Sequence, residues 1–534
     1  MFTFVSHNMP LSKTHIPFDK TRFFSKLFLD YNAGKLKDFY LYDPTAEGIK
    51  QFTEKNSYEE LDRALLVHEL KAQNSVIALS DLTKENIEKL AHKGTYTITT
   101  GHQLCLATGP LYFVYKIISV INLAEQLNKK YSDVDFVPVY WMATEDHDFE
   151  EVNSVNLFNK KFTWQSEQKG RVGEFSLEGV KHVLDDIRAV LGENENAKNI
   201  LAILERAYSQ KSLAEATRYL VNELFGKYGL IILDGNCKTL KHQFISEIKK
   251  DAFDNFAFRS VNETITSLKE KGYDAQVTPR EMNCFYADKG LRERFVFESN
   301  AYKVLNTDLF FSKEQLEKLI EHDTEKFSPN VVMRPLYQQK ILPNAAYVGG
   351  PGELAYWLEY KKMFATANIP LPVLMPRSFV LYVEKGLQQR MEKMGLKVDD
   401  LFSEKNKLQK EYALQQQPFD ISAEKQKLKE AFDSAKMKIA AIDKTLEAAT
   451  DAELQKALKG LENLEQKAIR SIKQKSEQSM NQIDAIHARF FPNDLPQERV
   501  DNFLRFYITN PNFIEEVKGQ LDPSQKDLAV LTEH

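Results

Sequence analysis

The sequence is poor in the features that mark several large classes of protein. It has only three cysteines among 534 residues, Cys105, Cys237 and Cys284, and none of them forms a CxxC pair. A disulfide framework and a cysteine-based zinc site are therefore not expected. A reducing, cytoplasmic setting fits this cysteine content best.

Long hydrophobic runs and an excess of basic charge are also missing. No window of about 18 uncharged apolar residues occurs, and residues 1–7 lack the basic and apolar regions of a signal peptide, so we expect neither secretion nor a membrane span. Lys and Arg number 71 against 76 Asp and Glu, a net charge of −5, which argues against a nucleic-acid binder with a broad basic surface. Both the P-loop pattern and the GxGxxG dinucleotide fingerprint are absent.

Two strand-like stretches with a helix between them carry the most information. Residues 96–100 and 136–143 have the apolar, β-branched and aromatic content of buried strands. A unit of this kind is nearly always a right-handed parallel crossover, so both strands end at the same edge of a sheet. Ligands bind at that edge in open α/β sheets. The polar residues at 101–103 and 145–148 are therefore predicted to converge.

The second polar cluster offers three carboxylates and an imidazole in four residues, Glu145, Asp146, His147 and Asp148. Such a set can act as a general base, orient an amine or bind a metal. A solvated acidic turn is the alternative, but the cluster directly follows a buried strand. We recognise no metal site, because no other histidine or carboxylate lies at a ligand spacing.

Gly109 and Pro110 open the helix of the crossover, with proline predicted at its first position. The free N–H groups of such a helix start favour a phosphate or carboxylate, although a purely structural helix start has the same pattern. Residues 349–353 place three glycines between a strand and a helix, where the backbone can approach a ligand or simply turn.

Three further side chains have two readings each. Arg334 and Arg377 are predicted to end short strands, where an arginine pairs with a ligand anion or forms an internal salt bridge. Cys105 has no identifiable base and is better explained as a small buried hydrophobic residue than as a nucleophile.

The remaining sequence predicts an α/β protein with several parts. Residues 1–160 contain N-terminal helices and the first half of a sheet core, 161–225 a helical insertion, and 226–400 the second half of the core with a smaller insertion. Residues 401–492 contain a coiled-coil hairpin, and 493–534 a helical tail. Apolar residues in the hairpin recur in steps of four and three, and Thr450 with Glu453 suggests a capping box at its turn. The pattern fits an intramolecular hairpin and a dimer seam equally well.

Several of these motifs together resemble the bacillithiol-biosynthesis cysteine-adding enzyme family, the cysteine ligases BshC. The order and spacing of the motifs agree over nearly the whole chain. The family usually has a second glutamine where this chain has His102, which can still donate or accept a hydrogen bond. The matching segments are 100–103, 108–112, 115–116, 145–149, 334–338, 342–343, 346–353, 355–357, 376–378 and 497–499.

The resemblance implies a Rossmann-like parallel sheet core akin to class I aminoacyl-tRNA synthetases and nucleotidyltransferases, with connecting-peptide insertions and a C-terminal antiparallel coiled coil associated with homodimers. It implies a ligase that joins cysteine to glucosaminyl-malate through an amide in the last step of bacillithiol synthesis. Activation of the cysteine carboxylate then suggests ATP, through cysteinyl-adenylate or an acyl phosphate. Nucleic acid and membrane are not expected partners.

These implications give each candidate residue an expected role. The catalytic group that orients and deprotonates the amine is Asp146, His147 and Asp148. The residues expected to bind the nucleotide are Gly101, His102, Gln103, Gly109, Pro110, Gly350 and Gly352. The residues expected to bind the substrates are Glu145, Arg334, Tyr347, Glu353, Trp357 and Arg377. Lys116 lies in the predicted second turn of the crossover helix, where a plain surface position is the alternative to a role in the site. A non-catalytic nucleotide-binding scaffold or regulator, and a nucleotidyltransferase with another acceptor, remain as alternatives.

Overall fold

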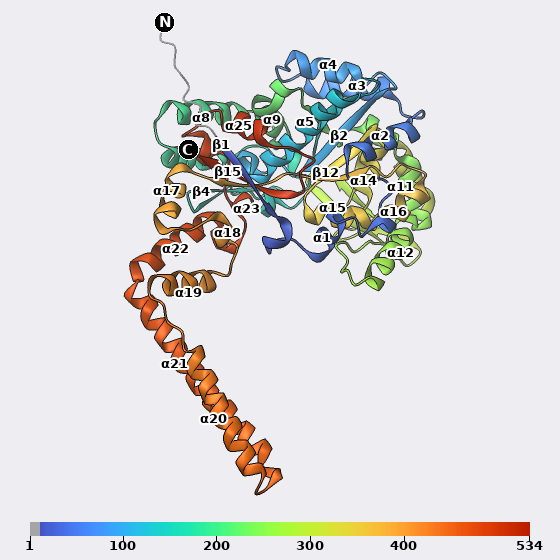
Figure 1. Ribbon diagram of the computed structural model, residues 1–534. Coiled ribbons are helices and arrows are strands. Elements are labelled where there is room, and N and C mark those ends of the chain that lie inside the picture. Colours follow the sequence, from blue (N-terminus) through green and yellow to red (C-terminus); the bar gives the residue numbers. More distant parts are fainter. Residues whose placement is uncertain (1–10) are drawn as a thin grey trace. The chain divides into compact units, whose positions relative to one another are not determined.

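The structure, a computed structural model, describes residues 11–534 (Figure 1). The N-terminal stretch 1–7, in which we find no signal peptide, lies outside the described residues. The chain divides into two units. One contains the residues up to Val383 together with Pro496–His534, and the other is Glu384–Leu495. Within residues 11–534, no helix has the length and apolar character needed to cross a membrane.

A five-stranded parallel sheet forms the centre of the first unit, in the order β13–β12–β2–β3–β6. Strand β2 (Thr95–His102) pairs in parallel with β3 (Asp135–Met142), and helix α5 (Tyr112–Lys130) connects them. The predicted strand–helix–strand unit is confirmed. Every residue of β2 is buried, as expected for a parallel strand covered on both faces.

The other strands of this sheet also follow the sequence pattern. From β2 the chain continues to β3 and β6 on one side, whereas β12 and β13 lie on the other side. The order therefore reverses beside β2, and a crevice at such a point is where α/β sheets bind ligands. The bounds are β6 Ile231–Asp234, β12 Asn344–Gly349 and β13 Val373–Pro376, with helices α14 Met333–Ile341, α15 Pro351–Glu359 and α16 Lys361–Ala367.

The predicted start of the crossover helix is wrong by two residues. Helix α5 begins at Tyr112, not at Pro110, and a short 3-10 turn at Leu106–Thr108 precedes it. The backbone N–H of Leu111 donates to the carbonyl of Asp501 at 2.8 Å. This contact from a distant segment, which local sequence does not reveal, holds the chain outside the helix at this point.

The position predicted for Arg334 is also wrong, because this residue lies in helix α14 and does not end a strand. The side-chain oxygen of Asn330 accepts hydrogen bonds from the backbone N–H groups of Val332 and Met333, at 2.8 and 3.2 Å. It satisfies donors that a helix start leaves free, so the chain turns into a helix here. Arg377 does follow a strand, β13, as predicted.

Segments inserted between the core strands build a second sheet, which is antiparallel with the order β10–β9–β8–β7–β11. The sheet lies within the smaller insertion predicted in 226–400, and β7 forms an antiparallel hairpin with β8. The bounds are β7 Cys284–Asp288, β8 Leu291–Glu298, β9 Ala301–Val304, β10 Phe310–Phe311 and β11 Phe327–Pro329, with helices α10 Lys238–His242, α11 Ile245–Asp254, α12 Phe256–Glu270 and α13 Lys313–His322.

The first insertion combines a small hairpin with the predicted helices. Its elements are α6 Phe149–Val152, β4 Ser154–Leu157, β5 Lys160–Thr163, α7 Val180–Leu191, α8 Glu195–Ala207 and α9 Leu213–Phe225. The N-terminal helices predicted in 1–160 are present. They are α1 Lys26–Asn32, α2 Ala46–Lys55, α3 Arg63–Asn74 and α4 Asp81–Lys89.

The C-terminal tail differs from its prediction as an all-helical segment. Helices α23 (Gln497–Val500), α24 (Leu504–Tyr507) and α25 (Phe513–Gln520) are followed by strand β15 (Asp527–Glu533). That strand lies between β1 (Leu11–Pro17) and β14 (Phe379–Val383) in a three-stranded sheet. Pairing with two strands that are distant in sequence, rather than local propensity, determines its structure.

The second unit contains the predicted antiparallel hairpin, made by α20 (Ser422–Ala440) and α21 (Glu447–Lys475). Ion pairs Lys425–Glu465 and Lys436–Asp451 fix its antiparallel register. The capping box predicted at Thr450 is wrong, because the turn lies earlier, where the Asp443 side chain accepts from the N–H of Thr445. The other helices are α17 Lys385–Met394, α18 Val398–Leu401, α19 Lys405–Gln416 and α22 Glu477–Phe490.

Candidate functional site

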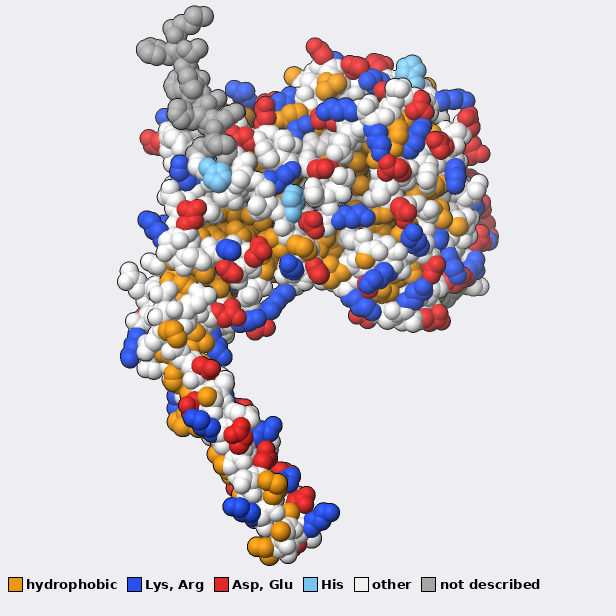
Figure 2. All heavy atoms as spheres, in the orientation of Figure 1, with side chains coloured by type: hydrophobic (Ala, Val, Ile, Leu, Met, Phe, Trp, Pro, Cys, Tyr) orange, Lys and Arg blue, Asp and Glu red, His pale blue; other side chains and the backbone are white. Residues whose placement is uncertain are grey.

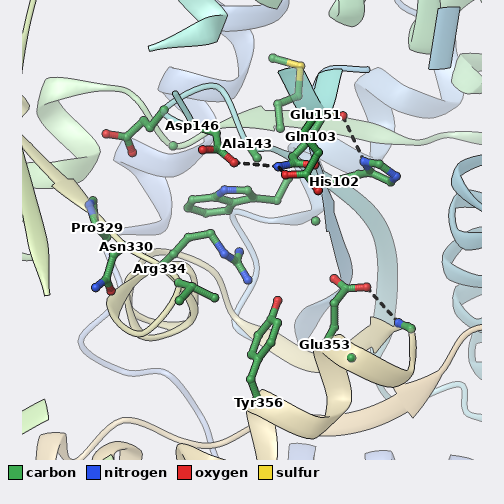
Figure 3. A pocket seen from close by; sticks show the side chains of 18 of the residues that line it. His102, Gln103, Ala143, Asp146, Glu151, Pro329, Asn330, Arg334, Glu353 and Tyr356 are labelled. Atoms are coloured by element: carbon green, nitrogen blue, oxygen red, sulfur yellow. Dashed lines mark hydrogen bonds between the residues drawn. The ribbon is translucent and has the colours of Figure 1, made fainter. Parts of the chain in front are cut away.

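The two polar clusters meet at the carboxyl ends of β2 and β3. The side-chain amide of Gln103 donates to Asp146 Oδ2 at 2.8 Å and to Glu151 Oε2 at 2.7 Å. The predicted convergence is therefore confirmed. Residues of both clusters, among them Gln103 and Asp146, face a cavity of about 720 Å³, with Arg334, Glu353 and Tyr356 on its other side (Figure 3).

Asp146 is the member of the acidic cluster whose carboxylate is built into the cavity wall. Its Oδ1 accepts the backbone N–H of His147 at 2.7 Å, in addition to the Gln103 contact. Burial alone would raise the pKa of Asp146, but the hydrogen bonds with His147 and Gln103 and the charge of Arg292 hold it well below the usual range. Asp146 is thus a stable anion and a weak base.

The neighbours of Asp146 have other contacts. Glu145 lines the cavity but forms an ion pair with the buried Lys241. The Nδ1 atom of His147 lies 2.7 Å from an Arg292 guanidinium nitrogen, which can only donate, so Nδ1 accepts. Asp148 accepts the N–H of Glu151 and caps helix α6. Neither His147 nor Asp148 lines the cavity.

Lys116 is buried at the cavity wall, which rules out the alternative of a plain surface position. Its ammonium donates to the carbonyl of Gly101 at 2.5 Å and to Glu353 Oε1 at 2.7 Å. Residues on all sides of it in α5 are buried. A helix that is apolar all round is the signal that could have revealed a buried lysine here.

Glu353 links three elements of the cavity wall. Besides Lys116, its carboxylate accepts the hydroxyl of Tyr347 at 2.6 Å and the N–H of Gly350 at 2.9 Å. Burial acts to raise the pKa of Glu353, but the Lys116 charge and these hydrogen bonds lower it below the usual range. Trp357 stacks on Tyr347 with ring centres 4.4 Å apart and does not itself line the cavity.

The glycines expected on the nucleotide side fall into two groups. Gly101, Gly350 and Gly352 line the cavity, and a Cβ atom added at Gly352 would meet nothing within 4 Å. Gly109 and Pro110 do not line it. The Gly109 carbonyl accepts from the Asn502 side chain at 2.5 Å. This turn is therefore engaged by the C-terminal segment.

His102 contributes a neutral ring to the cavity wall. Burial lowers the pKa of His102 to about 3. Its Nδ1 lies 3.1 Å from the Gln103 carbonyl and so carries the proton. Nε2 is then a buried acceptor that has no hydrogen-bond partner within residues 11–534. Cys105 is buried, which raises the pKa of its thiol to about 12 and fits the expected hydrophobic role.

The arginines of the cavity differ in how far they are already paired. Arg377 forms a two-pronged ion pair with Glu498, at 2.9 and 2.5 Å, so its internal salt bridge is found. Arg334 donates to Gln338 at 2.9 Å. The site residues expected from sequence did not include Arg280, Arg292 and Arg294 of the insertion. They did not include Arg499 of the tail either, although 497–499 is one of the segments that match the family.

Seven basic side chains line the cavity against four acidic ones, although the whole chain is acidic. This imbalance favours an anionic ligand. The basic residues are Lys116, Arg280, Arg292, Arg294, Arg334, Arg377 and Arg499, and the acidic residues are Glu145, Asp146, Glu151 and Glu353. In the described part of the chain, no group of three or more His, Cys, Asp and Glu side chains could hold a metal ion.

The fold and cavity define a Rossmann-like α/β protein with a crevice rich in basic side chains at the switch point of its sheet. The chain matches the family model for the bacillithiol biosynthesis BshC N-terminal Rossmann-like domain over residues 11–378, and that for the BshC C-terminal coiled-coil domain over 380–533. It therefore belongs to the bacillithiol biosynthesis BshC family.

Curated relatives agree with this assignment over the full length. A protein of Flavobacterium johnsoniae is 42% identical, and the match covers 97% of this chain and 99% of the relative. A protein of Bacillus mycoides is 29% identical, and the match covers 92% of this chain and 95% of the relative. Both carry the name "Putative cysteine ligase BshC". A crystal structure titled "putative arginyl t-RNA synthetase" from Campylobacter jejuni matches over 86% of this chain and 98% of its own chain, with 9% identity and a TM-score of 0.19. A likeness this weak does not establish a shared fold.

Proposed function

We propose that this protein is a cysteine ligase that forms an amide between the carboxyl group of cysteine and the amine of glucosaminyl-malate, in the last step of bacillithiol synthesis. The names of its full-length relatives support this proposal. The observation that carries it is the Gln103–Asp146 contact, which sets a stable anion at the edge of a cationic crevice.

Each end of the proposed acceptor has a complementary partner in the crevice. The malate carboxylates match the excess of basic side chains, among them Arg334, which Figure 3 shows at the cavity wall. The carboxylate of Asp146 matches the amine of the sugar and would attract and orient it. Because the pKa of Asp146 is low, we assign it orientation of the amine rather than storage of its proton.

The other members of the acidic cluster would act through Asp146. His147 contacts Arg292, whose charge also acts on Asp146, and Asp148 fixes the start of helix α6, which carries Glu151. Glu145 is paired with Lys241, and Glu353 with Lys116, so we assign both a positioning role.

The glycines and hydrogen-bonding groups that line the crevice also suit a nucleotide. Gly352 borders open space, so a ligand can approach the backbone there, and the Nε2 atom of His102 is a buried acceptor without a partner in residues 11–534. Gly101 and Gln103 lie beside them at the end of β2. ATP, when bound, would supply the group that activates the carboxylate of cysteine.

A reconstituted reaction tests the proposal. Purified protein is incubated with cysteine, glucosaminyl-malate and ATP, and bacillithiol is measured by mass spectrometry. We expect product from the wild type and at least about tenfold less from Asp146→Asn, the loss expected when a charge-assisted hydrogen bond is removed. Asp135→Asn, at the exposed opposite end of the same strand, is the matched control. Absence of product from the wild type would contradict the proposal, and nucleotide–pyrophosphate exchange without cysteine would favour a nucleotidyltransferase.

We further propose that the second unit mediates homodimer formation through its hairpin. Helix α20 has no buried residue, and the side chains of Met437, Ile442 and Leu464 are 71, 88 and 60% exposed. Hydrophobic side chains are visible along this hairpin in Figure 2. A second copy of the hairpin would cover them. The free thiols of the three cysteines fit the cytoplasmic setting that we assume for the reaction.

A further inference from the structure

An irregular segment between α12 and β7 forms part of the cavity wall. Residues 274–283 contain no helix or strand, yet Thr278 and Arg280 both line the cavity. The Arg280 side chain is exposed, and no hydrogen bond or ion pair of its guanidinium occurs within residues 11–534. A segment with so little regular structure needs other contacts to hold such a side chain in one place.

A buried carboxylate anchors the first end of this segment. Glu359 is completely buried at the end of α15, and it accepts the backbone N–H of Gln276 at 2.6 Å and that of Val277 at 3.3 Å. The same helix presents Glu353 and Tyr356 to the cavity. Glu359 therefore ties the segment to a helix that already belongs to the site.

A second buried carboxylate anchors the other end. Asp251 of α11 is completely buried and accepts both the backbone N–H of Asn283 at 2.5 Å and its side-chain amide at 3.1 Å. The Asn283 side chain in turn holds the backbone of Arg280: its Oδ1 accepts the Arg280 N–H at 2.9 Å, and its Nδ2 donates to the Arg280 carbonyl at 2.7 Å. Asn283 also accepts from Asn330, which lies beside Arg334 in Figure 3.

Two such carboxylates are costly to bury. Neither Glu359 nor Asp251 takes part in an ion pair within residues 11–534, and burial raises the pKa of each to about 7. A hydrophobic side chain would fill either position more cheaply. The hydrogen bonds that these groups provide all go to the segment that carries Arg280. Their common effect is to fix the backbone on both sides of that residue.

We propose that residues 276–283 form a fixed recognition arm, in which Arg280 binds an oxyanion of a substrate and Glu359 and Asp251 act as positioning residues. The inference deepens the proposed function and rests on it for the identity of the substrates. A carboxylate of the malate group and a phosphate of ATP share the required chemistry, since the planar guanidinium binds either one through paired hydrogen bonds.

Calorimetric binding of glucosaminyl-malate and of ATP, measured separately, tests the role of Arg280 without turnover. We expect Arg280→Gln to weaken one of the two at least about tenfold, and Arg280→Lys to restore part of the affinity. Arg259→Gln, which removes an exposed arginine of helix α12, is the control. The ligand that is affected identifies the oxyanion. Unchanged affinity for both ligands in Arg280→Gln would overturn the proposal.

Hydrogen exchange tests the positioning residues. In the wild type, the amides of Gln276, Val277 and Asn283 should exchange at least about tenfold more slowly than solvated loop amides, and exchange at the loop rate would overturn the anchoring. Glu359→Gln and Asp251→Asn should speed this exchange and weaken the same ligand as Arg280→Gln. Glu247 is a second buried carboxylate of α11, but it pairs with Lys340 rather than with the segment. Glu247→Gln should therefore change neither the exchange of these amides nor the binding of the ligand.

Combining substitutions distinguishes positioning from a general loss of stability. Because Glu359 acts through Arg280, the double variant Arg280→Gln/Glu359→Gln should bind no more weakly than Arg280→Gln alone. Additive losses would refute a role through Arg280. If the wild type makes no bacillithiol but its binding depends on Arg280, the proposed function fails and the recognition arm stands. If bacillithiol forms and binding is independent of Arg280, only the recognition arm fails.

Discussion

Replacing Lys116 by methionine should destabilise the first unit more than any change of a surface lysine. Methionine keeps most of the side-chain volume but removes the ammonium that contacts Glu353 and the Gly101 carbonyl. The carboxylate would then retain only the Tyr347 hydroxyl and the Gly350 N–H as donors. The loss therefore comes from leaving one charge of a buried pair without its partner.

The structure sets the size of this effect. Breaking a fully buried ion pair costs about 3–5 kcal/mol. The Lys116 side chain is 4% exposed but that of Glu353 is 24% exposed, so water can partly solvate the remaining carboxylate. We therefore expect the unfolding free energy to fall by about 2–3 kcal/mol. Lys116→Met/Glu353→Gln should be less destabilised than the sum of the two single variants, because it leaves no unpaired charge.

Tryptophan fluorescence during urea unfolding measures this quantity for the first unit alone. All three tryptophans, Trp141, Trp164 and Trp357, are buried in that unit and none lies in Glu384–Leu495. Lys129→Met, in the exposed last turn of the same helix, is the control. A loss below about 1 kcal/mol for Lys116→Met, or strictly additive single and double variants, would refute the buried charged pair.

Three other properties follow from the same structure. The folded pKa of Glu359, about 7, lies above its unfolded value, so the folded state binds more protons between about pH 4 and 7 and stability falls as pH rises through that range. The unfolding free energy of the wild type minus that of Glu359→Gln, measured by urea unfolding, should therefore fall by about 3 kcal/mol across this window. A difference that does not change with pH would contradict this expectation. Iodoacetamide at pH 8 should label the half-buried Cys237 well before the buried Cys105, and mass spectrometry showing the reverse order would contradict the assigned burial. Met437→Glu with Ile442→Glu should shift the protein from dimer to monomer in analytical ultracentrifugation, and an unchanged mass would exclude this surface as the seam.

The meeting of Gln103 and Asp146 could be predicted from sequence because it depends on few rules. Buried strands have a recognisable composition, a crossover between parallel strands has one hand, and both strands then end at one edge. The residues directly after each strand must converge there. Gly350, one of the glycines noted between a strand and a helix, follows the neighbouring strand β12 and lines the same cavity.

Other parts of the site depend on contacts that local sequence does not encode. Lys116 faces inward because helix α5 is covered on all sides, whereas most helices leave one face for their lysines. Arg280 reaches the cavity through an irregular segment without periodicity, and Arg499 through the C-terminal tail. For the same reason, the start of α5 was predicted wrongly, since Asp501 sets it from a distance.

A crystal structure of the protein with glucosaminyl-malate tests the central claim most directly. The account predicts that the sugar amine lies about 3 Å from the Asp146 carboxylate, with the malate carboxylates against arginines of the crevice. Density for the sugar outside this crevice, or within it but with the amine turned away from Asp146, would contradict the account.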